Sequence, residues 1–387
     1  MGEIPEMIRG LAVLVLLLGV GLMSNGNAHG ATEGGPLVFI SSFVGGDEGA
    51  VQAFQLDTAA GALKLVHRTP GIEHPFFLAI SPNHRFLYSI QAKEFGGAEH
   101  EFVAAYLIDH STGGLRCLNR QSTHGASSCY LELDGSGKTL LVANYDTGSV
   151  AAFPVQEDGS LREAASFFQH AGSSVDKERQ EGPHAHSFVI SPDNRHAYAA
   201  DLGLDQILGY RLDAAHAKLT PNQQPFVRTI PGAGPRHLTF HPNGKHLYAI
   251  NELANSVTLF DYDSKSGMLI ERQTISTVPE GFKGTSHTAD LKITPDGRFL
   301  YGTNRGHDSI AAYRLGEDGR LSLIEIQPSL GGGPQNLLIA ADGKLLICAN
   351  MAGSNVSVFR IDPQTGALTS TGAPLAVPSP SCIRLIP

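Results

Sequence analysis

The segment FLAISPNHRFLYSIQA, residues 77–92, decides the fold because the chain repeats it. Close copies are SFVISPDNRHAYAADL (187–202), HLTFHPNGKHLYAINE (237–252) and DLKITPDGRFLYGTNR (290–305). Looser copies are YLELDGSGKTLLVANY (130–145) and NLLIAADGKLLICANM (336–351). Each copy reads as an alternating apolar strand, a tight turn of Pro, Asn, Asp or Gly, and a second strand rich in Leu, Tyr and Ala. The repeat therefore predicts a β-hairpin that the chain uses six times.

A third strand follows most copies, and a less regular fourth strand follows the third. The third strands are VAAFPV (150–155), ILGYRL (207–212), VTLFDY (257–262), IAAYRL (310–315) and VSVFRI (356–361). Successive copies start 46 to 57 residues apart. Four strands at that spacing are typical of one blade of a β-propeller. No helical periodicity competes with this pattern in residues 36–387.

The two ends of the chain supply a seventh blade. PSCIRLIP (380–387) matches a first strand with nothing after it, whereas LVFISSF (37–43) and AVQAFQL (50–56) match a second and a third strand. Pairing the ends would close the circle and leave no exposed sheet edge. We therefore predict an all-β, seven-bladed propeller with four-stranded antiparallel blades, the last blade closed by N- and C-terminal strands.

The composition agrees with this fold and excludes one class of partner. Charged residues make up only 17%, and the chain has 44 Gly and 22 Pro, as expected for many strands and turns. The formal net charge of -9 argues against nucleic-acid binding, which needs a basic surface. We expect a monomer whose partner is a small molecule.

An apolar run at residues 11–23 precedes the repeats and is short for a membrane span. Gly26 and Ala28 occupy the small-residue positions of a signal-peptidase site. We predict a signal peptide over 1–28, a linker over 29–35 and the propeller over 36–387, in a protein exported to the periplasm or secreted, with no stable membrane anchor after cleavage. An uncleaved anchor is the alternative, and initiation at Met7 would give the run a more usual basic start.

The four cysteines follow no metal-ligand spacing. In an oxidising compartment the pairs nearest in sequence are Cys117–Cys129 and Cys348–Cys382. Buried free thiols explain these positions equally well.

In a propeller blade, residues just before the first strand and just after the second strand gather at one mouth of the central channel. The second strands end in Gln91, Asn144, Asp201, Asn251, Asn304 and Asn350, and we interpret these shared polar residues as caps on loop backbone. Next to them the repeats differ, and charge appears in three neighbouring blades only. The residues that stand out are His184, His186, Arg236, Glu252 and Arg305.

This set suits chemistry on an anionic substrate. Arginine matches carboxylate or phosphate with its planar fork, and a histidine beside a carboxylate is a plausible general base for activating water. The alternative is a structural Arg–Glu network between blades. A metal site at His184 and His186, with His287 as a further ligand, is a weaker hypothesis because the ligand set is incomplete. We predict neither a metal nor a cofactor.

An insertion at 171–182 lengthens the loop before His184 and carries Arg179, which suits a partial lid over the mouth.

The sequence resembles the lactonase family of seven-bladed propellers that includes bacterial 6-phosphogluconolactonase and fungal carboxymuconate cyclase. The resemblance extends from about Pro36 to the C-terminus and is strongest in ERQEGPHAH (178–186), GPRHLTFHPNGKHLYAINE (234–252) and DGRFLYGTNRGHDSI (296–310). It implies an enzyme that opens or closes a lactone ring without a nucleotide cofactor. It does not support a role for His287.

The resemblance carries catalytic roles onto a histidine of GPHAH, Arg236, Glu252 and Arg305, and we assign Arg179, Gln180 and His237 to substrate binding. Hydrolysis of 6-phosphogluconolactone or a related aldonolactone is the leading prediction, a small anionic lactone being the substrate. Carboxymuconate cyclase activity, a metal-dependent lactonase and a non-catalytic exported binding module are the alternatives. We expect Arg236→Ala and Glu252→Ala to depress hydrolysis by orders of magnitude and to leave thermal unfolding nearly intact.

Overall fold

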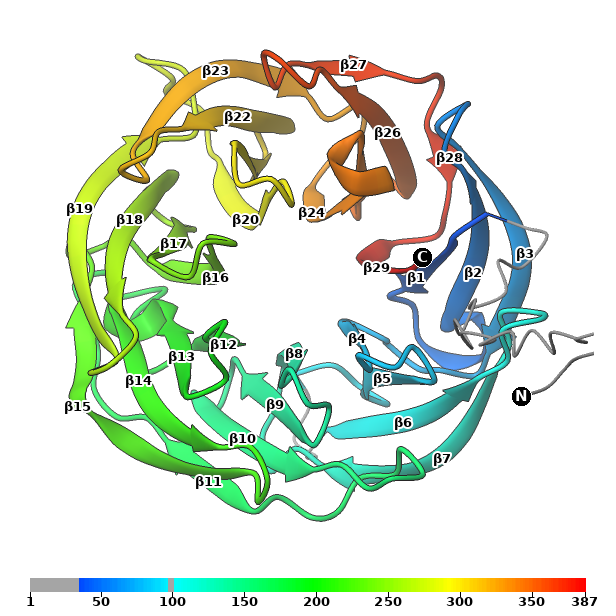
Figure 1. Cartoon of the computed structure of the whole chain (residues 1–387), viewed down its shortest axis with the longest axis horizontal. Coiled ribbons are helices and arrows are strands. Elements are labelled where there is room, and N and C mark those ends of the chain that lie inside the picture. Colours follow the sequence, from blue (N-terminus) through cyan, green and yellow to red (C-terminus); the bar gives the residue numbers. More distant parts are fainter. Residues whose placement is uncertain (1–34, 97–100) are drawn as a thin grey trace, which may run out of the picture. The chain divides into compact units, whose positions relative to one another are not determined.

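The computed structural model describes residues 35–96 and 101–387, and these residues form a seven-bladed β-propeller around a central channel (Figure 1). Each blade is a twisted antiparallel sheet of four strands. In the next paragraph the strand named first for each blade is the one that lines the channel. The predicted fold class is therefore confirmed. The predicted signal peptide at 1–28 lies outside the described residues. None of the helices in the described part has the length and apolarity needed to cross a membrane.

The strands of the blades follow chain order, with the C-terminal strand placed first. Blade one holds β29 (Pro380–Ile386), β1 (Leu37–Ser42), β2 (Ala50–Asp57) and β3 (Ala62–Pro70); blade two holds β4 (Leu78–Ile80), β5 (Phe86–Gln91), β6 (Phe102–Ile108) and β7 (Leu115–Ser122). Blade three holds β8 (Ser128–Leu133), β9 (Thr139–Asn144), β10 (Ser149–Pro154) and β11 (Ser166–Gln169); blade four holds β12 (Ala185–Ile190), β13 (His196–Asp201), β14 (Gln206–Asp213) and β15 (Lys218–Arg228). Blade five holds β16 (Pro235–Phe240), β17 (His246–Asn251), β18 (Ser256–Asp263) and β19 (Met268–Ser276); blade six holds β20 (His287–Ile293), β21 (Phe299–Arg305), β22 (Ser309–Leu315) and β23 (Leu321–Pro328). Blade seven holds β24 (Pro334–Ala340), β25 (Leu345–Asn350), β26 (Asn355–Ile361) and an outer edge split into β27 (Leu368–Ser370) and β28 (Leu375–Ala376). The described helices are the short 3-10 turns η1 (Gly46–Glu48), η2 (Leu202–Leu204) and η3 (Ala341–Gly343).

Strands from the two ends of the chain close the ring, as predicted. β29 pairs antiparallel with β1, so that Val38 faces Leu385 and Ile40 faces Ile383. Blade one therefore depends on residues more than 300 positions apart in the sequence. This pairing removes the two sheet edges that an open ring would expose.

A tyrosine of the second strand fastens four of the seven blades to the next. Tyr88, Tyr198, Tyr248 and Tyr301 are buried, and each donates its hydroxyl to the carbonyl of a turn glycine in the following blade, at 2.6 to 3.0 Å. A buried phenol needs such a partner, and the turn glycines have positive φ, which favours glycine. The tyrosine in the repeat thus has a structural role.

Four of the six shared polar residues at the ends of the second strands bond to loop backbone, as the repeats predicted: Asn144, Asp201, Asn304 and Asn350. The other two, Gln91 and Asn251, bond to side-chain hydroxyls. Asn144 donates to the Thr123 carbonyl at 3.1 Å, and Asn304 donates to the Thr277 carbonyl at 2.8 Å. These bonds satisfy backbone groups near the channel mouth. They leave the residue after each cap free to differ between blades.

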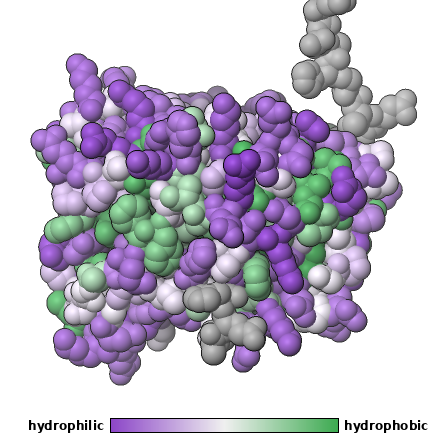
Figure 2. Space-filling view, turned by 90° about the horizontal axis from the view of Figure 1, so that it is seen from below, coloured by the Kyte–Doolittle hydropathy of each residue, from purple (hydrophilic) through white to green (hydrophobic). Residues whose placement is uncertain are grey.

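The outer strands carry the surface hydrophobics. Leu65 and Val66 on β3, Ile270 on β19 and Leu323 on β23 are between 42% and 52% exposed. Figure 2 shows one flank of the propeller, where apolar side chains lie between hydrophilic ones. The four cysteines are free thiols, so neither pairing considered from the sequence is formed.

Candidate active site

In four of the innermost strands a β-bulge redirects one residue at the channel mouth. The strand register shifts at Cys129, His186, Arg236 and Gln335, which are the extra residues of bulges in β8, β12, β16 and β24. A bulge bends the strand and redirects the side chain of the extra residue. These are the positions just before the first strand at which the sequence repeats disagree.

The bulge residues line a cavity of about 410 Å³. Residues that follow second strands, and residues of the connecting loops, complete the lining. The full set is Phe43, Phe76, Phe95, Ser127, Cys129, Tyr145, Asp146, Arg179, His186, Arg236, Glu252, Arg305, Gln335 and Met351. A cavity of this size accommodates a small-molecule ligand.

Three arginines converge on one carboxylate in this cavity. Arg236 Nε lies 2.8 Å from Glu252 Oε2, Arg305 Nη2 lies 2.7 Å from the same oxygen, and Arg179 Nη2 lies 2.7 Å from Oε1. The Arg236 side chain is only 1% exposed, whereas those of Arg179 and Arg305 are 35% and 27% exposed. The arginines therefore differ in their access to a ligand and to solvent.

The electrostatics of this cluster favour an anion. Burial alone would raise the pKa of Glu252, but the charges of Arg305 and Arg236 hold it below its usual value. Burial, together with the nearby Arg305, lowers the pKa of Arg236 to about 10. Glu252 is thus ionised and compensates one of three positive charges. The remaining positive charge suits a negatively charged substrate or a developing oxyanion.

His186 is the histidine that lines the cavity. It is 6% exposed, its Nδ1 lies 3.5 Å from Cys129 Sγ, and the Tyr145 ring packs edge-on against it at 5.2 Å. Burial and the charge of Arg236 lower the pKa of His186 well below its usual value. The imidazole is therefore neutral at physiological pH, and one of its ring nitrogens carries a lone pair.

His184 also contacts Tyr145 but is not part of the cavity lining. Its ring stacks on Tyr145 with centroids 4.5 Å apart, its Nδ1 lies 3.1 Å from the Tyr145 carbonyl oxygen, and its Nε2 lies 3.3 Å from Glu181 Oε1. Of the two histidines proposed from the sequence, the geometry favours His186 for chemistry and His184 for supporting Tyr145.

The insertion does bring Arg179 to the mouth. Asp176 caps the loop by accepting bonds from the backbone nitrogens of Glu178 and Arg179 at 2.9 and 3.2 Å. Gln180 is fully buried, and its Nε2 donates to the Leu202 carbonyl at 2.8 Å. Gln180 was assigned to substrate binding, but the structure places its side chain inside the loop, where it anchors the segment that carries Arg179.

Two further histidines named from the sequence lie outside the cavity lining. His237 is buried, and it contacts Asp290 and Arg236 instead of the cavity, since strand alternation resumes after the bulge residue Arg236. The backbone oxygen of His287 accepts a bond from Arg305 Nε at 3.3 Å. Within residues 35–96 and 101–387 no group of three or more His, Cys, Asp or Glu side chains is arranged to hold a metal ion.

An aromatic wall of Phe43, Phe76 and Phe95 belongs to blades one and two and so lies across the channel from the arginines of blades five and six (Figure 1). Phe76 and Phe95 stack with centroids 5.1 Å apart, and Phe43 meets each of them edge-on at 5.2 and 5.0 Å. Next to Phe95, the Gly96 backbone nitrogen donates to Glu101 Oε1 at 3.1 Å. The sequence analysis missed this wall, because it looked for charges that break the repeat and all three residues of the wall are apolar.

Comparisons with known proteins show the family to which the chain belongs. The family model described as "Lactonase, 7-bladed beta-propeller" matches residues 37–385. The chain therefore belongs to the lactonase family of seven-bladed β-propellers, as the motifs suggested, and its class of activity is that of a carboxylic-ester hydrolase.

Particular relatives cover nearly the whole chain. It is 36% identical over 343 residues to the 6-phosphogluconolactonase of Bacillus subtilis, an alignment that covers 88% of this chain and 95% of the relative. It is 32% identical over 354 residues to the 6-phosphogluconolactonase of Formosa agariphila, covering 90% and 99%. Among solved structures, the periplasmic gluconolactonase of Pseudomonas aeruginosa superposes with a TM-score of 0.85 at 32% identity, covering 91% of this chain and 99% of the other.

Proposed function

We propose that this protein hydrolyses a sugar lactone, 6-phosphogluconolactone or a related aldonolactone, at the cavity lined by Arg179, His186, Arg236 and Arg305. The observation that carries the proposal is the arrangement of three guanidinium groups on the single carboxylate of Glu252, beside a neutral imidazole. Charge and a proton acceptor are thus brought to one small cavity. Ester hydrolysis by activated water needs both.

The reaction begins with the attack of water on the lactone carbonyl carbon, and His186 takes a proton from that water. The carbonyl oxygen becomes an oxyanion, which Arg236 and Arg305 stabilise with N–H donors. The ring C–O bond then breaks, and the ring oxygen takes the proton from the imidazolium. The product is the open-chain hydroxy acid.

Glu252 keeps the three arginines together in this scheme. Without a shared carboxylate their charges would repel one another, and the side chains would separate. Glu252 makes its described contacts with arginines and none with a histidine. We therefore assign it the role of orienting the guanidinium groups.

The names of relatives support the choice of substrate. Two of them are 6-phosphogluconolactonases, and a structural neighbour is a periplasmic gluconolactonase. Arginine forks bind phosphate and carboxylate alike, so the cavity suits a lactone with or without a 6-phosphate.

The test is base uptake at constant pH by purified protein, with freshly prepared δ-gluconolactone and its 6-phosphate and with spontaneous ring opening subtracted. We expect hydrolysis of at least one of the two. Turnover of carboxymuconate alone would identify a cyclase, and no turnover of any of these compounds would indicate a non-catalytic binding module. Loss of rate in chelator would point to a metal-dependent lactonase.

We also propose that the protein is exported and acts as a monomer. The apolar run at 11–23 and the small residues Gly26 and Ala28 support export, as does the periplasmic neighbour. N-terminal sequencing of protein from the periplasm or medium would test cleavage after residue 28. Sedimentation analysis would test the monomer.

A further inference from the structure

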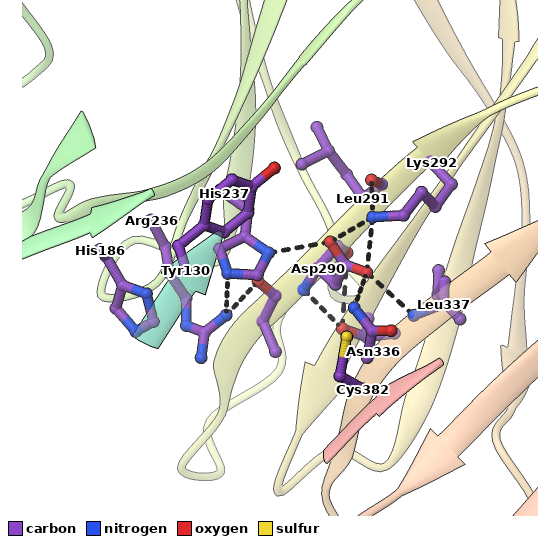
Figure 3. A network of polar contacts seen from close by, with 12 residues as sticks. Tyr130, His186, Arg236, His237, Asp290, Leu291, Lys292, Asn336, Leu337 and Cys382 are labelled. Atoms are coloured by element: carbon purple, nitrogen blue, oxygen red, sulfur yellow. Dashed lines mark hydrogen bonds and ion pairs between the residues drawn. The ribbon is translucent and has the colours of Figure 1, made fainter. Parts of the chain in front are cut away.

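A chain of buried polar contacts runs from Arg236 through His237 to Asp290 (Figure 3). Its Nη1 lies 3.1 Å from Nε2 of His237, and Nδ1 of His237 lies 2.8 Å from Oδ1 of Asp290. His237 is 3% exposed and Asp290 is 1% exposed. These contacts link Arg236, which lines the cavity, to the interior of the channel wall.

Asp290 is firmly positioned by its own partners. Lys292 Nζ lies 2.8 Å from both carboxylate oxygens, and Oδ2 also accepts from Asn336 Nδ2 at 2.7 Å and from the Leu337 backbone nitrogen at 2.9 Å. Four donors from three strands surround one carboxylate. The Asp290 carboxylate is therefore held in a fixed orientation as a hydrogen-bond acceptor. The proton between Asp290 and His237 accordingly resides on Nδ1 of His237.

This arrangement sets the tautomer of His237. Burial, with the charge of Arg236, lowers the pKa of His237 to about 3, so the ring is neutral. A neutral imidazole that donates from Nδ1 has a lone pair at Nε2. Arginine is always a donor, so Nε2 of His237 accepts from Arg236 Nη1.

The other hydrogen bonds of the Arg236 guanidinium show how the bond to His237 fixes its orientation. Nε donates to Glu252, and Nη1 also donates to the Ala289 carbonyl at 2.6 Å. In the described part of the chain Nη2 is the guanidinium nitrogen with no protein partner, and Arg236 lines the cavity. Contacts on two sides thus fix the plane of the guanidinium and leave Nη2 for a ligand.

We propose that His237, backed by Asp290, is a positioning residue that locks the guanidinium plane of Arg236 so that Nη2 donates to the lactone. The proposal rests on the proposed function. It replaces the substrate-binding role assigned to His237 from the sequence. Residues that orient a catalytic group from behind typically contribute about 10- to 100-fold to activity.

Two substitutions of His237 separate its bond to Asp290 from its bond to Arg236. In His237→Asn the amide nitrogen replaces Nδ1, so the bond to Asp290 is kept and the acceptor for Arg236 is lost. In His237→Gln the side-chain oxygen reaches the place of Nε2 and restores that acceptor. His246→Asn is the matched control, because His246 is a buried histidine of the same blade that contacts an aspartate, Asp261, at 3.2 Å.

We expect His237→Asn to lower kcat for the lactone by about 10- to 100-fold with a smaller change in KM, since the missing orientation matters most in the transition state. His237→Gln should recover most of this loss, and His246→Asn should retain wild-type kcat. Equal losses in His237→Asn and His237→Gln, or a loss that follows only the melting temperature across the three variants, would overturn the proposal.

A second measurement does not depend on turnover. Nitrogen NMR of protein with 15N-labelled histidine and arginine should show His237 as the neutral Nδ1–H tautomer. It should also show a slowly exchanging Arg236 Nε–H in wild type and His237→Gln that exchanges faster in His237→Asn. An Nε2–H tautomer, or unchanged Arg236 exchange in His237→Asn, would reject the positioning role. If the wild-type protein opens no lactone, the proposed function fails, and these spectra still decide whether His237 orients Arg236.

Discussion

Arg236 and Glu252 meet across the hairpin of β16 and β17, with Nε 2.8 Å from Oε2. Pro235 pairs with Asn251 in this hairpin, so the bulge at Arg236 and the residue after the cap Asn251 become neighbours. Both side chains are buried. Removing either partner would therefore leave the other as a buried charge without its counter-ion.

Glu252→Gln should impair both stability and activity. The substitution leaves Arg236 buried and short of a counter-charge, and breaking a buried ion pair typically costs about 3 to 5 kcal/mol. We expect a clear drop in the melting temperature and a loss of about 100-fold in kcat/KM for the lactone. This revises the sequence-based expectation that thermal unfolding stays nearly intact.

Chemical denaturation and initial rates would check this prediction, with Glu271→Gln on the exposed edge of β19 as the control. A Glu252→Gln variant with wild-type stability would show that the arginines do not need the carboxylate.

His186→Gln and His184→Gln should differ sharply. His186 lines the cavity and is the proton acceptor in the proposed reaction, and removing a general base typically lowers kcat by about 100- to 10,000-fold. His184 supports Tyr145 by stacking, so its replacement should cause a much smaller loss, seen mainly in KM. Steady-state kinetics of the two variants would check this. A larger loss from His184→Gln would reverse the assignment.

The rate should be insensitive to mild acid. His186 acts in its neutral form, and burial together with Arg236 and His237 lowers its pKa, so the neutral form persists below pH 6.5 and is lost only as the pH falls through the shifted value. We expect kcat/KM to stay level from about pH 8 to about pH 5.5. At the lowest pH values of this range, the assay would detect the product directly instead of measuring base uptake. A decline centred near pH 6.5 would contradict the assignment of His186 as the base.

Phe95→Ala should weaken substrate binding without slowing the chemical step. Phe95 packs against Phe43 and Phe76 in the aromatic wall and lines the cavity, so we expect it to contribute packing area to the bound ring. Aromatic contacts are worth about 0.5 to 1.5 kcal/mol, and KM should rise by about 2- to 13-fold with kcat nearly unchanged. Phe167→Ala, on β11 and 43% exposed, is the control. A fall in kcat with constant KM would place Phe95 in the chemistry.

The sequence predicts the blades, the closure of the ring and the convergence of Arg236, Glu252 and Arg305, because repeats that must all build one strand pair reveal where a residue departs from the common pattern. It does not predict the direction of a side chain next to a bulge. His237 follows the bulge residue and turns into the channel wall, and Gln180 turns into its own loop. Both depend on local backbone geometry that residue types do not encode.

The aromatic wall was hidden for another reason. Phe43 and Phe95 lie in connections between strands, where no repeat exists against which to judge them. An apolar residue in such a loop carries no charge that would mark it as unusual. Only the three-dimensional arrangement places these rings opposite the arginines.

The pairing of β29 with β1 also makes the last strand of the chain part of blade one. Without residues 380–386, β1 lacks its inner neighbour and blade one has an unpaired edge. A polypeptide shortened by this strand would therefore leave the ring open between blades seven and one.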